Sequence, residues 1–292
     1  MAFYSGSKLN KNLVFGNNGE IGNISFPNSG DNIVASNEIK IAQGVAQFFR
    51  IAVDNGKIIG GAPQDSTNGT NAGAAYIYDL DGTNEIKLTA SDGASGDEFG
   101  GSVAIGYNKI VVGARRDDDN GTNSGSVYIF DLNGNQLAKI TPSDAADNDY
   151  DNFGLTVEIG SGRILVSSSR WAAQAIYIFD LNGNELAKIT ESNNIKISGT
   201  TFAIGHNKIA AEVQDDNNIG SVAIYDLNGN YISSITATDA APEMFFGRAI
   251  ALNSGKMVVS APHYVTTSSA VYIYDTNQYY EDYIEKTLEL IG

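Results

Sequence analysis

The chain has 292 residues, of which 42% are hydrophobic, with 32 glycines, five prolines and no cysteine. Its 18 Lys and Arg residues against 34 Asp and Glu residues give a formal net charge of −16, which opposes binding to nucleic acid or to an anionic membrane surface. The lack of cysteine excludes disulfides and thiolate metal sites, and no stretch has the length and apolarity of a transmembrane helix, so membrane insertion is not expected. The composition predicts a turn-rich, all-β protein that can bury a core.

Residues 1–46 are the least regular part of the sequence. Residues 1–11 predict an N-terminal arm that lacks the basic and apolar regions of a secretory signal. Residues 12–46 contain short runs that predict strands, namely Asn12–Gly16, Glu20–Phe26, Asn32–Ala35 and Glu38–Ala42. Because Asn37–Ile41 echoes Asn84–Leu88 further along the chain, residues 12–46 predict either a degenerate copy of the repeat described next or an anchor.

The clearest copy of a repeat spans Phe99–Pro142. It predicts four strands, at Ser102–Gly106, Lys109–Ala114, Ser126–Asp131 and Gln136–Thr141. The second and third strands are apolar at consecutive positions, which is typical of strands buried on both faces. Asn133-Gly134 predicts a two-residue hairpin turn with positive φ angles at both residues.

The same pattern recurs at about residues 47–90, 98–142, 152–190, 198–236 and 245–291. The YIYD motif of its third strand, or a close variant, begins at Tyr76, Tyr128, Tyr177, Ala223 and Tyr272, at spacings of 52, 49, 46 and 49 residues. Four-stranded antiparallel units at this spacing indicate the blades of a β-propeller. Residues 12–292 therefore predict five clear blades plus a degenerate N-terminal sixth, and the alternative is five blades with an N-terminal arm.

Two short motifs that recur together in the repeats, a Phe-Gly pair and a later small-residue segment, resemble a known family signature. Phe99-Gly100 with Gly113-Ala114, and Phe246-Gly247 with Ser260–Pro262, resemble the FG-GAP repeats of integrin α-chain propellers and of many bacterial and phage proteins. The resemblance covers roughly Phe48 to Ile291 and implies the fold, while it is unspecific for function. Met1–Leu9 also resembles leader segments of tailed-phage virion proteins.

Loops that follow the second and fourth strands of each blade are expected on one face, which gathers most of the acids. The candidate calcium ligands there are Asp117, Asp119, Asp147, Asp149 and Asp151, because calcium takes hard oxygen ligands from flexible acidic loops. The alternative is that these acids cap turns and stay solvated. No cofactor is required by this prediction.

The same face is expected to carry a recognition surface made of Arg115, Arg116, Arg170, Trp171, His263 and Tyr264. An exposed aromatic ring beside arginines can stack on a sugar or anchor a protein partner. The alternative for Trp171 is that it fills the seam between two blades.

The C-terminal segment is rich in tyrosine, a residue type favoured at interfaces. Tyr279, Tyr280 and Tyr283 are candidate contacts to a neighbouring subunit, and the alternative is packing against the first blade. Tyr283–Ile291 is predicted as the last strand of the fifth blade.

Catalysis is not predicted. The two histidines, His206 and His263, are expected on opposite faces, and no Ser-His-Asp set, phosphate-binding glycine loop or H-E-x-x-H motif is present. A glycosidase that uses two carboxylates alone is the remaining enzymatic alternative.

Together these features predict a non-enzymatic binding or structural protein on a virus particle, as a tail-fibre, tail-tip or capsid-associated component. Its expected partners are other virion proteins and a host surface glycan or protein. Such a protein is assembled in the host cytoplasm and released by lysis, so it needs no secretory signal. The alternatives are a cellular adhesin or surface carbohydrate- or protein-binding module, and an intracellular scaffold.

Overall fold

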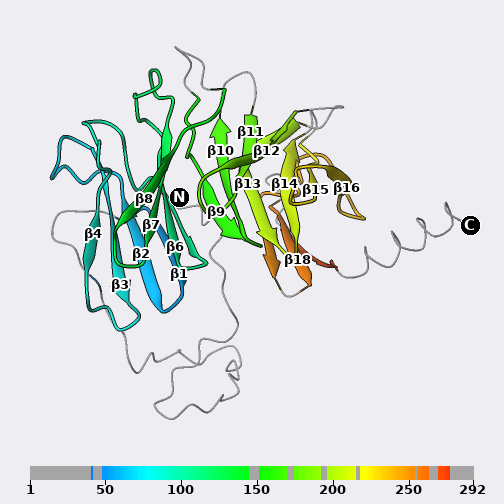
Figure 1. Ribbon diagram of the computed structural model, residues 1–292. Coiled ribbons are helices and arrows are strands. Elements are labelled where there is room, and N and C mark those ends of the chain that lie inside the picture. The colour runs from blue at the N-terminus through cyan, green and yellow to red at the C-terminus, as the bar shows by residue number, and fades with distance from the viewer. Residues whose placement is uncertain are drawn as a thin grey trace, which may run out of the picture.

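The computed structural model describes residues 41, 48–144, 151–169, 174–191, 196–214, 218–253, 255–262 and 269–276. These residues form 19 strands in five antiparallel sheets and contain no helix (Figure 1). Accordingly, no helix in these ranges could cross a membrane.

Each sheet takes its strands in chain order. The first contains β1 (Arg50–Asp54), β2 (Lys57–Ala62), β3 (Ala74–Asp79) and β4 (Ile86–Leu88). The second contains β5 (Ser102–Gly106), β6 (Lys109–Ala114), β7 (Ser126–Asp131) and β8 (Gln136–Ile140). The third contains β9 (Val157–Gly160), β10 (Arg163–Ser169), β11 (Gln174–Phe179) and β12 (Glu185–Thr190).

The fourth sheet contains β13 (Lys196–Gly205), β14 (Lys208–Gln214), β15 (Ser221–Tyr225) and β16 (Tyr231–Ile235). The fifth contains β17 (Ile250–Asn253), β18 (Lys256–Ala261) and β19 (Ala270–Asp275). Its predicted fourth strand and the predicted N-terminal strands lie outside the described residues, apart from Ile41.

The five sheets surround a common cavity. The first strand of every sheet (β1, β5, β9, β13 and β17) contributes to its lining, and the cavity has a volume of about 380 Å³. From the first sheet to the fifth, each sheet packs face to face on the next through one of four separate apolar clusters. Sheets that share an axis and bury their faces against one another form a β-propeller, which confirms the predicted fold.

Burial within a blade follows the predicted pattern. In the second sheet, β5 is buried throughout, β6 is buried after Lys109 and β7 is buried before Asp131, because both faces of these strands meet a neighbouring sheet. The hairpin between β5 and β6 turns through Tyr107 and Asn108, which both have positive φ angles near 55°. A two-residue turn of this kind matches the twist of the flanking strands.

The second hairpin of the blade differs from the prediction. The connection between β7 and β8 has four residues, 132–135, and Gly134 has a positive φ of 87° whereas Asn133 does not have one. The Asp131 carboxylate accepts hydrogen bonds from the backbone N–H groups of Asn133 and Asn135, at 2.9 Å each. This side-chain cap builds the turn, so the two-residue Asn-Gly hairpin was the wrong turn type.

The signature residues of the repeat meet at the seams between blades. Phe99, Phe153 and Phe246 are fully buried and pack edge-to-face on the third-strand tyrosine of their own repeat, as Phe99 does on Tyr128 at 5.4 Å between ring centroids. Gly113 faces the next blade, where a Cβ atom would collide with the carbonyl oxygen of Gly154. The glycine is therefore required by the close approach of two backbones.

Candidate binding surface

Loops that follow the second strands and loops that follow the fourth strands lie together on one side of the propeller, which we call the loop face. The clearest evidence is Tyr128 on β7, whose hydroxyl lies 2.8 Å from a carboxylate oxygen of Asp92 and 2.7 Å from one of Asp117. Asp92 follows β4 and Asp117 follows β6. The predicted sorting of these two loop types to one face is therefore confirmed.

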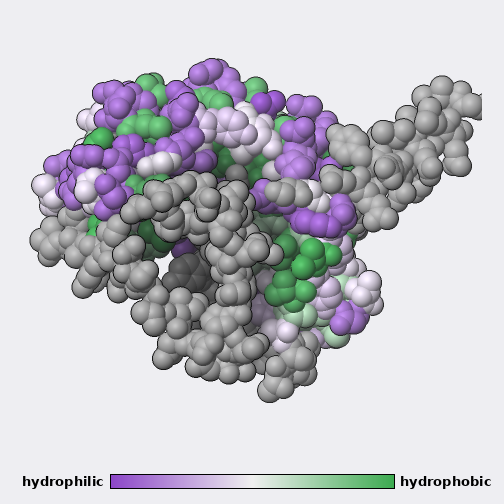
Figure 2. Space-filling view, turned by 90° about the horizontal axis from the view of Figure 1, so that it is seen from below, coloured by the Kyte–Doolittle hydropathy of each residue, from purple (hydrophilic) through white to green (hydrophobic). Residues whose placement is uncertain are grey.

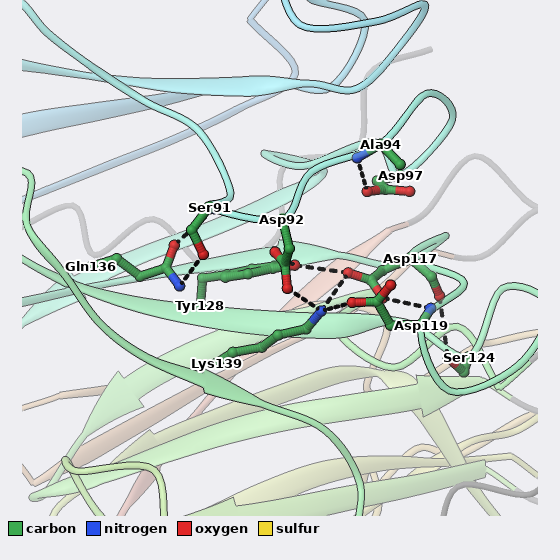
Figure 3. A network of polar contacts seen from close by, with 10 residues as sticks. All are labelled: Ser91, Asp92, Ala94, Asp97, Asp117, Asp119, Ser124, Tyr128, Gln136 and Lys139. Carbon is green, nitrogen blue, oxygen red and sulfur yellow. Dashed lines mark hydrogen bonds and ion pairs between the residues drawn. The ribbon is translucent and has the colours of Figure 1, made fainter.

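Lys139 on β8 lies at the centre of this group of acids (Figure 3). Its Nζ is 2.8 Å from Asp92 and 3.1 Å from Asp117, and it also pairs with Asp119. The ammonium group lies 5.3 Å from the centroid of the Tyr128 ring. One lysine thus supplies the positive charge for three carboxylates. One of these carboxylates, that of Asp117, is almost completely buried.

The same arrangement recurs in other blades. In the first sheet Asp65 accepts a hydrogen bond of 2.6 Å from Tyr76 and pairs with Lys87 at 3.0 Å. In the third sheet Asp144 accepts from Tyr177 at 2.7 Å and pairs with Lys188. We call these groups the Lys–Asp–Tyr clusters, and they tie the acidic loops to the outer two strands of the blade.

Ionisation at these clusters follows from the same contacts. Burial alone would raise the pKa of Asp65, but hydrogen bonds from Tyr76, Thr67 and Lys87 outweigh it and hold the pKa well below its usual value. Burial and the hydrogen bond to Asp117 raise the pKa of Tyr128 far above its usual value. Burial would lower the pKa of Lys139, but its hydrogen bonds to Asp119, Asp92 and Asp117 raise it.

The predicted metal ligands fall into three groups. Asp117 and Asp119 lie with Asp92 in a cluster whose carboxylate oxygens are within 4.8 Å of one another, and Lys139 occupies the position among them. Asp151 is buried, and its backbone carbonyl accepts hydrogen bonds of 2.9 Å from Ser168 and Ser169. Asp147 and Asp149 lie outside the described residues.

Arg115 and Arg116 converge on one acid. Arg115 Nη2 lies 2.7 Å from Glu98 Oε2, and Arg116 Nη1 lies 2.9 Å from Glu98 Oε1. Glu98 is held in place by its backbone, since its N–H donates to the carbonyl of Asn71 at 3.1 Å and its φ is 55°. Two guanidinium groups on one carboxylate leave this spot with net positive charge.

A pocket of about 190 Å³ opens beside this pair of arginines. Its lining comes from the first three blades and consists of Phe49, Arg50, Pro63, Gln64, Glu98, Gly101, Arg115 and Leu155. Two cationic side chains, one acidic side chain, one amide and several apolar side chains therefore meet in one concave site on the loop face. Pockets that combine apolar walls with a few polar groups are typical ligand sites.

The other members of the predicted recognition surface, Arg170, Trp171, His263 and Tyr264, lie outside the described residues, as do Tyr279, Tyr280 and Tyr283. Arg50, Gln64 and the cluster lysines were not predicted as site residues from the sequence. A signal for the lysines existed, because Lys87, Lys139 and Lys188 follow Tyr76, Tyr128 and Tyr177 at one constant spacing.

Known proteins are similar to this chain in a sequence repeat and in overall structure. The FG-GAP repeat family matches residues 83–130 and 231–274. The acylaminoacyl peptidase of Pyrococcus horikoshii has a TM-score of 0.50 at 10% identity, over 79% of this chain and 38% of that chain. The β-propeller domain of the Trilobed protease from Pyrococcus furiosus has a TM-score of 0.48 at 12% identity, over 79% of this chain and 69% of that chain. No curated protein sequence matches the chain.

The fold and the loop face define the class of this protein, which is a β-propeller. Two of its segments, one centred on the second blade and one on the fifth, match the FG-GAP repeat family. At 10% identity the likeness to the peptidase extends to the fold alone, and this chain spans less than two fifths of that enzyme.

Proposed function

We propose that this propeller is a non-enzymatic binding or structural protein on the surface of a virus particle, as part of a tail fibre, a tail tip or the capsid surface. It binds a host surface glycan or protein, or a neighbouring virion protein, through the loop face. The resemblance of Met1–Leu9 to phage leader segments and the occurrence of FG-GAP repeats in phage proteins support the location.

The observation that carries the binding function is the pocket beside Arg115 and Glu98. In a chain with a net charge of −16, a locally positive concave site attracts an anionic group while the surrounding acids repel other anions. Arginine recognises planar carboxylates through paired hydrogen bonds. An acidic sugar or the carboxylate of a protein side chain fits this chemistry.

Two measurements test the location and the binding. Mass spectrometry of purified particles should find the chain at constant copy number, and recovery only from cell-envelope fractions would favour the adhesin alternative. Labelled protein should bind host cells or tail-deficient particles, and the double variant Arg115→Gln/Arg116→Gln should bind at least tenfold more weakly. The matched control is Lys109→Gln, because Lys109 begins β6 at the end opposite the arginines.

The non-enzymatic part of the proposal has its own test. Incubation of the purified chain with a panel of surface glycans should release no product, as judged by mass spectrometry. Hydrolysis by the wild-type chain that is lost in the arginine variant would instead make the pocket an active site.

A further inference from the structure

The seams between consecutive blades show how a complete neighbour buries a sheet. In the second sheet Val127 and Ile129 on β7 face the third sheet and are fully buried. In the fourth sheet Val222 and Ile224 on β15 face the fifth sheet and are buried as well. The alternate residues of the third strand thus form the contact with the next blade.

Within the described ranges, no residue covers the fifth sheet in this way. Val271 and Ile273 on β19 occupy the same positions relative to the strand's tyrosines, yet they are 65% and 69% exposed. Figure 2 shows hydrophobic surface on the right-hand side of the molecule, the side on which β18 lies in Figure 1. An aliphatic face of this kind on a monomer marks a contact site.

The first sheet has a matching open face on its other side. Ile51 and Val53 occupy the positions on β1 that Val103 and Ile105 occupy on β5. Both pairs of residues have the same register with the second strand of their own sheet. Val103 and Ile105 are buried against the first sheet, whereas Ile51 and Val53 are 59% and 44% exposed. The ring of described sheets therefore ends in two apolar faces, one on the first sheet and one on the fifth.

We propose that residues 12–46 close the ring by filling the sector between these two faces. Ile41 is the one described residue of this segment, and it packs on the open side of the first sheet, against a cluster that includes Tyr76 and Tyr78. Phe48 packs edge-to-face on the same two tyrosines, at 5.9 and 6.5 Å. The chain is thus already seated on this face where it enters β1.

The length of residues 12–46 favours this segment over the two other candidates for the sector, which are residues 277–292 and a second copy of the chain. The second sheet uses residues 102–140 for its four strands, and 12–46 is a segment of nearly that size with four predicted strands. Residues 277–292 contain Tyr283–Ile291, which is the predicted fourth strand that the fifth sheet needs to match the other sheets. A second copy of the chain would have to cover two different faces, and a dimer with twofold symmetry joins identical patches.

A photo-crosslinking experiment on the full chain tests this proposal without reference to any ligand. Benzoylphenylalanine replaces Ile273 in one variant and Ile51 in another, and ultraviolet light is followed by digestion and mass spectrometry. Both variants should form crosslinks to peptides within residues 12–46, in material that stays at the mass of a monomer. Leu137→benzoylphenylalanine is the control, since Leu137 lies on an outer strand and is 48% exposed; it should form at least tenfold less crosslinked peptide.

The other outcomes overturn the proposal. Crosslinks in material of twice the monomer mass would assign the faces to a second copy. Crosslinks only to residues 277–292, or yields no higher than those of the Leu137 control, would show that the N-terminal segment does not occupy the sector. Circular dichroism of each variant confirms beforehand that it is folded.

Discussion

At the scale of single residues, several carboxylates of the loop face are neutralised by lysines of the same protein. Asp65 and Asp144 each accept a hydrogen bond from a tyrosine, and Asp92 and Asp117 share the hydroxyl of Tyr128. All four carboxylates pair with a lysine of an outer strand. Much of the acidity read from the sequence is therefore used to fix loops.

Replacing Lys139 by Met should expose the mutual repulsion of three carboxylates. Because two of them are partly or fully buried, we expect the free energy of unfolding to fall by about 2 kcal/mol. Calcium should raise the melting temperature of this variant more than that of the wild type, since the ion would take the place of the ammonium group. Thermal unfolding with calcium and with chelator measures both effects.

The control is Lys256→Met, which removes an exposed pair with Asp275 and should cost less than about 1 kcal/mol. Equal calcium effects on the wild type and on the Lys139 variant would show that the lysine does not occupy a cation position.

Asp65 should make folding stability depend on pH in the acidic range. Its pKa is lowered in the folded state, so its contribution is present above the unfolded value of about 3.9 and is lost as pH falls towards the folded value. Asp65→Asn should cost about 2 kcal/mol at pH 7, and this difference should shrink below about pH 4. Urea unfolding of both proteins between pH 7 and pH 3 tests the sign, and a difference that grows towards pH 3 would contradict it.

Sequence patterns predicted where the acids lie, because loop position follows from strand order in a blade. They did not predict what the acids do. The partners Tyr128 and Lys139 lie on strands, where their residue types read as ordinary strand and surface positions. Only the register between β7 and β8, which pairs Tyr128 with Lys139, brings them to the same loop.

At the scale of the element, the repeated signature describes how one blade meets the next. Gly113 should not tolerate a side chain, because a Cβ would meet the Gly154 carbonyl and the Ser102 hydroxyl. We expect Gly113→Ala to lower the free energy of unfolding by about 2–3 kcal/mol, measured by urea denaturation. Gly101→Ala is the matched control, since the atom nearest to the added Cβ would be the Glu98 carbonyl oxygen at 3.2 Å. A similar loss of stability in both variants would show that the close approach of the two blades at Gly113 does not require glycine.

The fourth blade carries an irregularity at the corresponding position. Glu212 on β14 is buried, one of its carboxylate oxygens has no hydrogen-bond partner, and its nearest cation is Arg248 at 3.6 Å. Restoring the small residue of the other repeats by Glu212→Ser should raise stability by about 1 kcal/mol. Glu191→Ser, an exposed site, should change it by less than about 0.5 kcal/mol, and a destabilised Glu212 variant would assign the acid a structural role.

The strands of the second blade were predicted almost to the residue, because apolar runs and turn residues alternate clearly there. The four-residue connection after Asp131 was not, since the Asn-Gly pair is typical of another turn. The deciding group is the Asp131 carboxylate, whose contacts with Asn133 and Asn135 are visible only in three dimensions.

At the scale of the whole molecule, five radial sheets bring loops that are far apart in sequence to one face. Phe49, Arg115 and Leu155 line one pocket although they belong to three different blades. The repeat spacing predicted the ring, while the pocket depends on side-chain contacts that no single repeat contains.

The radial arrangement can be measured directly by distances between spin labels, because the native chain has no cysteine. Labels on cysteines placed at the inner hairpins, at Asn55, Asn108, Asn207 and Asn253, report on the first, second, fourth and fifth sheets. In a ring, the distance from position 55 should rise from 108 to 207 and be shorter again at 253. A distance that increases steadily from 108 through 207 to 253 would show a row of sheets and contradict the propeller.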